Sequence, residues 1–379
     1  MWYMTLERKL LRKIVKEFAE KEIRPFIPDL ENDIYPVEII KKLGKIGVLG
    51  LCHDKKFGGH GVDYINWYIA LEEISKVSST VALLATQTTH LCAHLSGDLF
   101  TPAQVEKYIK PAVRGDIILG QFVTEHNGFV SVSDFETTAV RDGNDWIING
   151  GKVLSTNADV CDYAMVVCKT SDNSDAASMY GASMFMVSKD NPGFTVGHIE
   201  NKFGMRGSST GQTYFNNCRV SNDDLIGKVD ECLILLGNRL NDGLGLYAAL
   251  ALGSAEAVYE KTRTFLSERM RAGKSLWDTH QVIRNQMAEM WIQIENLRCA
   301  LYGYAEMQNQ NMNVSGLGIA LKVEGVRIAK SVCDTCMTLH GGLGTVKEVD
   351  IERYYRDVKM FDITCGSNFT LIDTLASSL

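Results

Sequence analysis

Apolar residues recur every three or four positions through the first part of the chain, which is the spacing of one face of a helix. One such stripe runs from Leu6 to Phe18, with Thr5 placed to cap its start and Pro25 beyond its end. The same spacing predicts a second helix that opens at Tyr35-Pro36 and a long helix from Tyr64 to about Phe100. We therefore expect the chain to begin with a helical region.

The pattern changes near residue 117 to short runs rich in β-branched and aromatic residues, which predict strands. The runs are Gly120–Glu125, Trp146–Leu154, Tyr163–Cys168, Ser183–Val187 and Thr213–Val220. Turn signals such as Asp142-Gly143-Asn144 separate them. Helical spacing returns after Gly227 and continues to the end, with breaks near Gly273 and between Gly341 and Gly344.

This order of helices, strands and helices predicts an α+β protein with three domains. We expect an N-terminal helical domain over residues 1–118, a central β-barrel-like domain over residues 119–228 and a C-terminal four-helix-type bundle over residues 229–379. The 379 residues are enough for each domain to bury its own core.

Net charge and cysteine usage bear on binding partners, cellular location and metal binding. The formal net charge of -7 gives no electrostatic reason to bind nucleic acid or an anionic membrane, so we expect neither. The ten cysteines follow no regular framework and indicate reduced thiols, and Met1 does not open a secretory signal, so we expect a cytoplasmic protein. The pairs His90 and His94, and Cys333 and Cys336, lack further ligands at zinc-site spacing, so we expect no metal site.

Several motifs resemble those of the acyl-CoA dehydrogenase family, and the resemblance covers essentially the whole chain. The strongest is Lys202–Thr210 with its exit to Gly227, and it is joined by Val123-Thr124-Glu125, Asn149–Asn157 and Arg353–Asp373. The resemblance implies the acyl-CoA dehydrogenase fold and FAD as cofactor. It also implies an acyl thioester substrate on CoA or a carrier protein, an electron-transferring flavoprotein as acceptor, and a homotetramer or homodimer that shares FAD across subunits.

The resemblance also implies which residues meet the flavin. Thr124 and its neighbours correspond to a strand end that meets the ring, Thr156 to a hydrogen-bonding partner near flavin N5, and Leu154 stands where a tryptophan is usual. Arg269 corresponds to an arginine that reaches the FAD pyrophosphate of a neighbouring subunit. The expected FAD-binding residues are Phe122, Val123, Thr124, Leu154, Thr156, Arg269, Gln281, Gly341, Gly342 and Ser367.

The chain departs from the family pattern at the position of the catalytic base. Cys365 stands at the position of the catalytic glutamate, and Gly243 stands at the alternative site of that glutamate. A thiol is a weak base unless a positive neighbour lowers its pKa. Cys365, Asp242 and His90 are therefore the candidate proton-transfer residues, although ordinary structural roles for Asp242 and His90 stay open. The expected substrate contacts are Gln87, Leu91, Val130, Asn241, Leu244 and Gly366.

The sequence thus predicts an FAD-dependent oxidoreductase that dehydrogenates an acyl thioester or catalyses the reverse reduction, with a replaced or relocated base. Two alternatives remain open at this point. One is a flavin monooxygenase or a desulfinase-like flavoenzyme on the same fold, which would not need a base for an α proton. The other is an inactive flavin-binding scaffold.

Overall fold

The N-terminal part of the chain is helical. The computed structural model describes residues 2–89, 99–128, 134–171, 180–232, 243–314, 316–377 and 379. Its first helices are α1 (Leu6–Phe18), α2 (Ile27–Glu31), α3 (Val37–Lys45), α4 (Tyr64–Ser75), α5 (Ser79–Thr86), α6 (Pro102–Gln104) and α7 (Lys110–Arg114). The structure confirms the first predicted helix, including its Thr5 cap, whose side chain accepts from the backbone N–H of Arg8.

The single long helix predicted from Tyr64 to Phe100 is wrong. Helix α4 ends at Ser75, and α5 begins after Ser78, whose extended backbone breaks the helix. The Ser78 side chain caps α5 by accepting from the N–H of Val81 at 3.2 Å. Residues 90–98 of the predicted helix lie outside the described residues.

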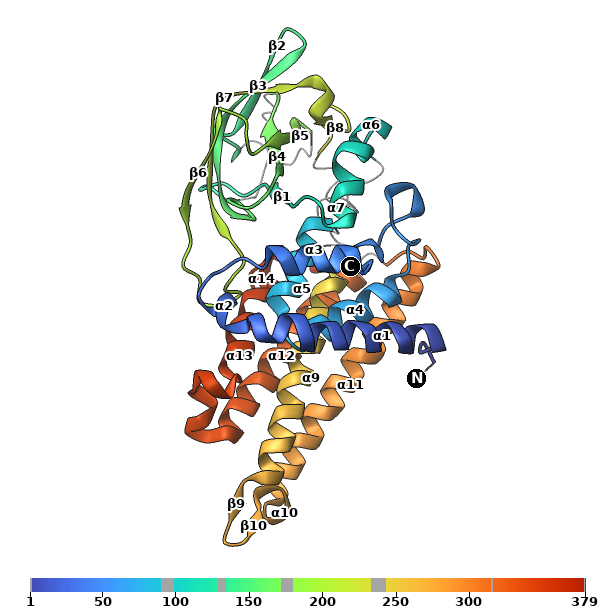
Figure 1. Ribbon diagram of the computed structural model, residues 1–379, viewed down its shortest axis with the longest axis vertical. Coiled ribbons are helices and arrows are strands. Elements are labelled where there is room, and N and C mark those ends of the chain that lie inside the picture. The colour runs from blue at the N-terminus through green and yellow to red at the C-terminus, as the bar shows by residue number, and fades with distance from the viewer. Residues whose placement is uncertain are drawn as a thin grey trace.

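A mixed sheet forms the central part. Its strands are β1 (Leu119–Phe122), β2 (Thr138–Asp142), β3 (Asp145–Thr156), β4 (Tyr163–Lys169), β5 (Ala182–Ser188), β6 (Phe194–Ile199), β7 (Thr210–Ser221) and β8 (Leu225–Ile226). They run in the order β6-β7-β3-β2-β4-β5-β8, and β1 pairs in parallel with β4. The long β3 and β7 lie antiparallel and carry the sheet down toward the helices (Figure 1).

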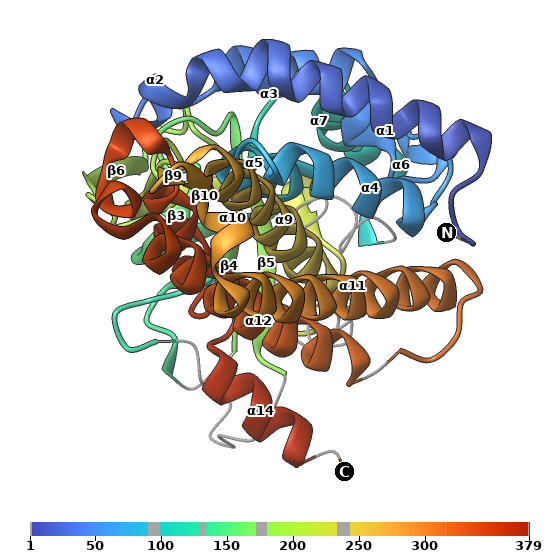
Figure 2. The same cartoon turned by 90° about the horizontal axis from the view of Figure 1, so that it is seen from below.

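The C-terminal part is a helical bundle with a small hairpin at its tip. It contains α9 (Gly245–Glu268), α10 (Leu276–Thr279), α11 (Gln281–Asn309), α12 (Leu317–His340), α13 (Glu352–Phe361) and α14 (Asn368–Ala376), with β9 (Met270–Arg271) and β10 (Lys274–Ser275). Figure 2 shows α11 and α12 side by side, with α14 at the edge of the bundle. Figure 1 places the hairpin at the opposite end of the molecule from the sheet.

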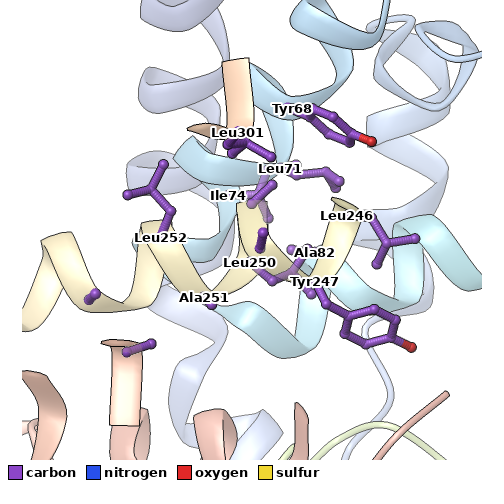
Figure 3. Close-up of a cluster of buried hydrophobic side chains, with 14 of the residues drawn as sticks. Tyr68, Leu71, Ile74, Ala82, Leu246, Tyr247, Leu250, Ala251, Leu252 and Leu301 are labelled. Carbon is purple, nitrogen blue, oxygen red and sulfur yellow. The ribbon is translucent and has the colours of Figure 1, made fainter. Parts of the chain in front are cut away.

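The two helical parts share one hydrophobic core rather than burying separate cores. Leu71 and Ile74 of α4 pack against Leu250 of α9 in this core (Figure 3). The helices approach closely at Gly253, where an added Cβ would lie 2.3 Å from the carbonyl oxygen of Glu72. The N-terminal helices and the bundle therefore form one packed body, against which the sheet is set.

Candidate active site

Cys365 lies in the short loop between α13 and α14, in an uncommon backbone conformation. Its φ of 55° falls in the left-handed region, and the next residue, Gly366, has a φ of 86°. Ser367 ends the loop and caps α14 by accepting from the N–H of Thr370 at 3.2 Å. A non-glycine residue held in this conformation often marks a functional site, and here it leaves the thiol half-buried at the junction.

Lys322 of α12 fixes this loop from beneath. Its side chain is fully buried, and its ammonium donates to the carbonyl oxygens of Thr364 and Gly366, the two neighbours of Cys365. Burial lowers the pKa of Lys322 to about 8, although the nearby Cys365 and Asp362 partly offset that effect. The chain has thus placed a buried amine next to the thiol.

Tyr247 of α9 completes the surroundings of the thiol. Its ring lies 5.2 Å from the Lys322 ammonium and meets Phe361 of α13 edge-on, with centroids 5.9 Å apart. In Figure 3 its hydroxyl points away from the apolar cluster formed by the rest of α9. Burial, followed by the neighbouring Cys365 thiol, raises the pKa of Tyr247 well above its usual value, so this group stays a neutral donor.

Of Lys322 and Tyr247, only Lys322 could have been singled out from the sequence pattern. Lys322 follows Ile319 by three positions and precedes Val326 by four, so it stands on the apolar face of its helix. A lysine on such a face needs buried partners. Tyr247 gave no comparable signal, because an aromatic residue in the apolar run Leu244–Leu252 is ordinary for a core helix.

The helix that leads into the loop is tied to the sheet through the Lys202–Thr210 motif. The buried Asp357 of α13 accepts from the N–H of Met205 at 2.6 Å and from the hydroxyl of Ser79 at 3.2 Å. Arg356 donates to the carbonyl of Phe203 at 3.1 Å. The motif therefore joins the sheet, the N-terminal helices and the helix before Cys365.

The structure brings the expected flavin-facing residues of the sheet together. The N–H of Val153 donates to the carbonyl of Thr124 at 2.9 Å, which places the end of β1 beside β3. The bulge in β3 gives Leu154 a φ of 52° and leaves its side chain 61% exposed. Thr156 is half-buried, whereas the side chain of Phe122 is buried in the sheet core, so only the backbone of Phe122 is available to a ligand.

A second set of expected FAD residues lies at the far end of the bundle. Arg269 and Gln281 are exposed at the ends of α9 and α11, near the hairpin tip (Figure 1). The stacked rings of Phe265 and His340, 4.3 Å apart, bring Gly341 beside the end of α9. Within one chain this set is far from the sheet, so one chain does not assemble both sets around a single ligand.

The remaining predicted residues divide into two groups. Gly366 is exposed in the Cys365 loop, while Gln87 and Leu244 are 7% and 3% exposed, with Leu244 in the shared core. Five predicted residues lie outside the described residues: His90, Leu91, Val130, Asn241 and Asp242. Among the described residues no group of three or more His, Cys, Asp or Glu is arranged to hold a metal ion, and no described helix is long and apolar enough to cross a membrane.

Comparison with known proteins identifies the family. The chain matches the N-terminal, middle and C-terminal domains of acyl-CoA dehydrogenase over residues 5–116, 120–218 and 235–379. It belongs to the acyl-CoA dehydrogenase family. The protein is thus an acyl-CoA dehydrogenase-like flavin oxidoreductase, and FAD is the cofactor of its family.

Individual relatives cover nearly the full chain. It is 33% identical to a short-chain-specific acyl-CoA dehydrogenase of Clostridium acetobutylicum, over 96% of both chains. It is 30% identical to subunit CarC of the caffeyl-CoA reductase-Etf complex of Acetobacterium woodii, over 97% of this chain and 96% of the relative. The structure of butyryl-CoA dehydrogenase from Megasphaera elsdenii superposes with a TM-score of 0.93 at 27% identity, covering 99% and 98% of the two chains.

The residues present fit FAD. An added Cβ at Gly341 or Gly342 would meet nothing within 4 Å, so a ligand has open space beside this backbone. The exposed guanidinium of Arg269 suits phosphate oxygens, and Thr124 and Thr156 offer polar groups at adjoining strand ends. When bound, FAD supplies the redox chemistry of the site, and the protein supplies binding, orientation and proton transfer.

Proposed function

We propose that this protein catalyses the reductive reaction of its family, adding hydrogen across the α,β double bond of an acyl thioester, with the thiol of Cys365 as proton donor. The acyl group is carried by CoA or by a carrier protein, and an electron-transferring flavoprotein supplies the electrons. The observation that carries the proposal is the thiol at position 365, held at a φ of 55°, at the position that the motif resemblance assigns to the family's catalytic carboxylate.

The argument rests on which group donates and which accepts a proton at neutral pH. Free carboxyl groups of glutamate titrate near pH 4.3, so well under 1% are protonated at pH 7 and they act as bases. Free thiols titrate near pH 8.5, so most of them still hold their proton at pH 7. Dehydrogenation needs a base at the α carbon, whereas reduction needs an acid there. A thiol at this position therefore favours reduction.

Two neighbours of Cys365 do not compete with it as bases. Tyr247 offers only a donor, because its phenol stays protonated. Among the groups acting on Lys322 and Tyr247 in the described chain, Asp362 is the one carboxylate, and Lys330 and Lys359 already pair with it at 2.6 Å and 2.9 Å. The name of the Acetobacterium woodii relative, a reductase-Etf complex subunit, supports both the direction and the electron donor.

The direct test is anaerobic. The purified flavoprotein is reduced chemically, a panel of unsaturated CoA and carrier-bound thioesters is added, and the return of the oxidised-flavin absorbance is followed. We expect one class of thioester to reoxidise the flavin and Cys365→Ala to slow that step about 100-fold or more, the usual contribution of a positioned acid. The matched Cys299→Ala variant, which removes an exposed thiol elsewhere on α11, should react like the wild type.

A third variant tests the direction. Cys365→Glu restores a carboxylate, so we expect it to dehydrogenate a saturated thioester faster than the wild type while losing rate in reduction. A wild-type reduction rate in Cys365→Ala would contradict the role of the thiol. Substrate hydroxylation with oxygen uptake would favour the monooxygenase alternative, and flavin that no thioester reoxidises would favour the scaffold.

A further inference from the structure

The ammonium of Lys322 has one N–H donor more than the hydrogen bonds that it makes to described residues. An ammonium group carries three N–H donors and no acceptor. Two of them point to the carbonyls of Thr364 and Gly366, on either side of Cys365. The third has no hydrogen-bond acceptor in the described part of the chain, although the side chain is fully buried and Cys365 acts on its charge.

The hydroxyl of Tyr247 is in the same situation. It is buried and has no hydrogen bond of ordinary geometry with a described residue, but it lies near enough to the Cys365 thiol for a side-chain hydrogen bond between them to contribute to its raised pKa. The titratable group that acts on it is the thiol of Cys365. A buried donor without an acceptor costs free energy, and the sulfur of Cys365 is the neighbour that the Lys322 ammonium and the Tyr247 hydroxyl share.

We infer that Lys322 and Tyr247 form a thiolate-binding pocket, which holds the sulfur of Cys365 after it has given up its proton. This inference rests on the proposed function and deepens it. As the β carbon takes a hydride from the reduced cofactor, the C=C π bond breaks and its electron pair binds the proton of the S–H bond at the α carbon. The electron pair of the S–H bond stays on sulfur. The ammonium and the phenol O–H then satisfy the new charge, as donors do in an oxyanion hole. Water returns the proton between turnovers.

The pocket also assigns each neighbour a role. Lys322 and Tyr247 act through Cys365 and are positioning residues. Asp362 faces Lys322 but accepts from Lys330 and Lys359 at 2.6 Å and 2.9 Å, so its charge is already matched. Cys365 and Asp362 are the described groups that raise the pKa of Lys322 against burial.

The test uses the reactivity of the sulfur rather than turnover. Iodoacetamide alkylates thiolates, and peptide mass spectrometry gives separate rates for Cys365 and the exposed Cys299 in one holoprotein sample. We expect Lys322→Met to slow alkylation of Cys365 about tenfold or more at pH 7, which is the effect of removing an adjacent opposite charge. Tyr247→Phe should slow it about threefold, the effect of one hydrogen bond. The rate at Cys299 should not change.

Matched variants separate the pocket from mere loop support. Lys322→Arg keeps the charge and the donors, so its Cys365 rate should stay near that of the wild type. Tyr247→Phe keeps the ring and its packing, so it remains informative if Lys322→Met fails to fold. Unchanged Cys365 alkylation in both Tyr247→Phe and Lys322→Met would overturn the inference.

The alkylation test and the test of the proposed function can fail separately. If alkylation responds to both variants while Cys365→Ala still reduces thioesters at the wild-type rate, the pocket stands and the proton-donor role fails. If Cys365→Ala abolishes reduction while Lys322→Met and Tyr247→Phe leave the alkylation rate of Cys365 unchanged, the donor role stands and the pocket fails.

Discussion

At the scale of single residues, Lys152 and Glu125 form a buried ion pair beside the end of β1. The two side chains are 0% and 4% exposed, and Nζ lies 2.6 Å from Oε1. The glutamate also accepts from the N–H groups of Glu136 and Thr137, and the lysine donates to the carbonyl of Val123. Burial opposes ionisation of Glu125, but Lys152 outweighs it and lowers the pKa of the carboxyl. The pair therefore positions the strand end that carries Thr124.

Removing one partner of this pair should be costly. We expect Lys152→Met to destabilise the protein by about 3–5 kcal/mol, because it leaves a buried carboxylate without its counter-ion. Its FAD content should also fall, since the strand end loses its support. Denaturant unfolding measures the first effect and flavin absorbance the second. The double variant Lys152→Met/Glu125→Gln removes both charges and should recover part of the lost stability. If it recovered none, the two side chains would stabilise the sheet by packing rather than by their charges.

At the scale of elements, a buried ion network joins α4, α9 and α11. Glu256 of α9 lies 3.0 Å from Lys76, just after α4, and 2.7 Å from Arg298 of α11. Burial opposes ionisation of Glu256, but these two cations outweigh it and lower its pKa to about 2. A carboxyl group with a lowered folded-state pKa stabilises the fold above its unfolded pKa, and that stability is lost as the pH falls toward the folded value.

This network gives a pH prediction. Relative to Glu256→Gln, the wild type should be more stable at pH 7 by up to about 3 kcal/mol, the free energy of a shift of this size. The difference should shrink as the pH falls from about 4.5, the ordinary carboxyl value, toward 2. Thermal melts of both proteins across this range measure it. The exposed Glu17→Gln is the matched control, and a constant difference down to pH 2 would contradict the assignment.

Element patterns also explain what the sequence could and could not predict. The first helix was predictable because it has one polar face, so its periodicity is visible. The strands were predictable because they are short runs rich in β-branched and aromatic residues with turn signals between them, even where, as in β4 and β5, both faces are buried. The break between α4 and α5 was not, because both helices are buried on nearly all sides and no Gly or Pro marks the break. Motif resemblance located Cys365, but Tyr247 and Lys322 join it only through the packing of α9 and α12 against the loop.

At the scale of the whole molecule, the two sets of expected FAD residues lie at opposite ends of the folded molecule. The sheet carries Thr124 and Thr156, and the bundle tip carries Arg269 and Gln281 (Figure 1). The family resemblance implies that Arg269 reaches the FAD of a neighbouring subunit, so we predict that a complete site takes the bundle tip of a second copy. A homo-oligomer with such a shared site has a testable consequence, because defects at opposite ends of the chain then fall in different sites.

Hybrid oligomers test this sharing. Arg269→Ala and Thr156→Trp, each alone, should lose FAD, the first by removing the phosphate partner and the second by adding bulk at the strand end. In co-expressed hybrids, one of the two sites in a mixed pair combines an intact sheet with an intact tip. Random pairing should then restore FAD in roughly a quarter of the sites, by the symmetry of a two-fold pair. Co-expression of Arg269→Ala with Gln281→Ala, two defects at the same tip, should restore none. If neither mixture recovered FAD, each chain would bind its FAD without its neighbour.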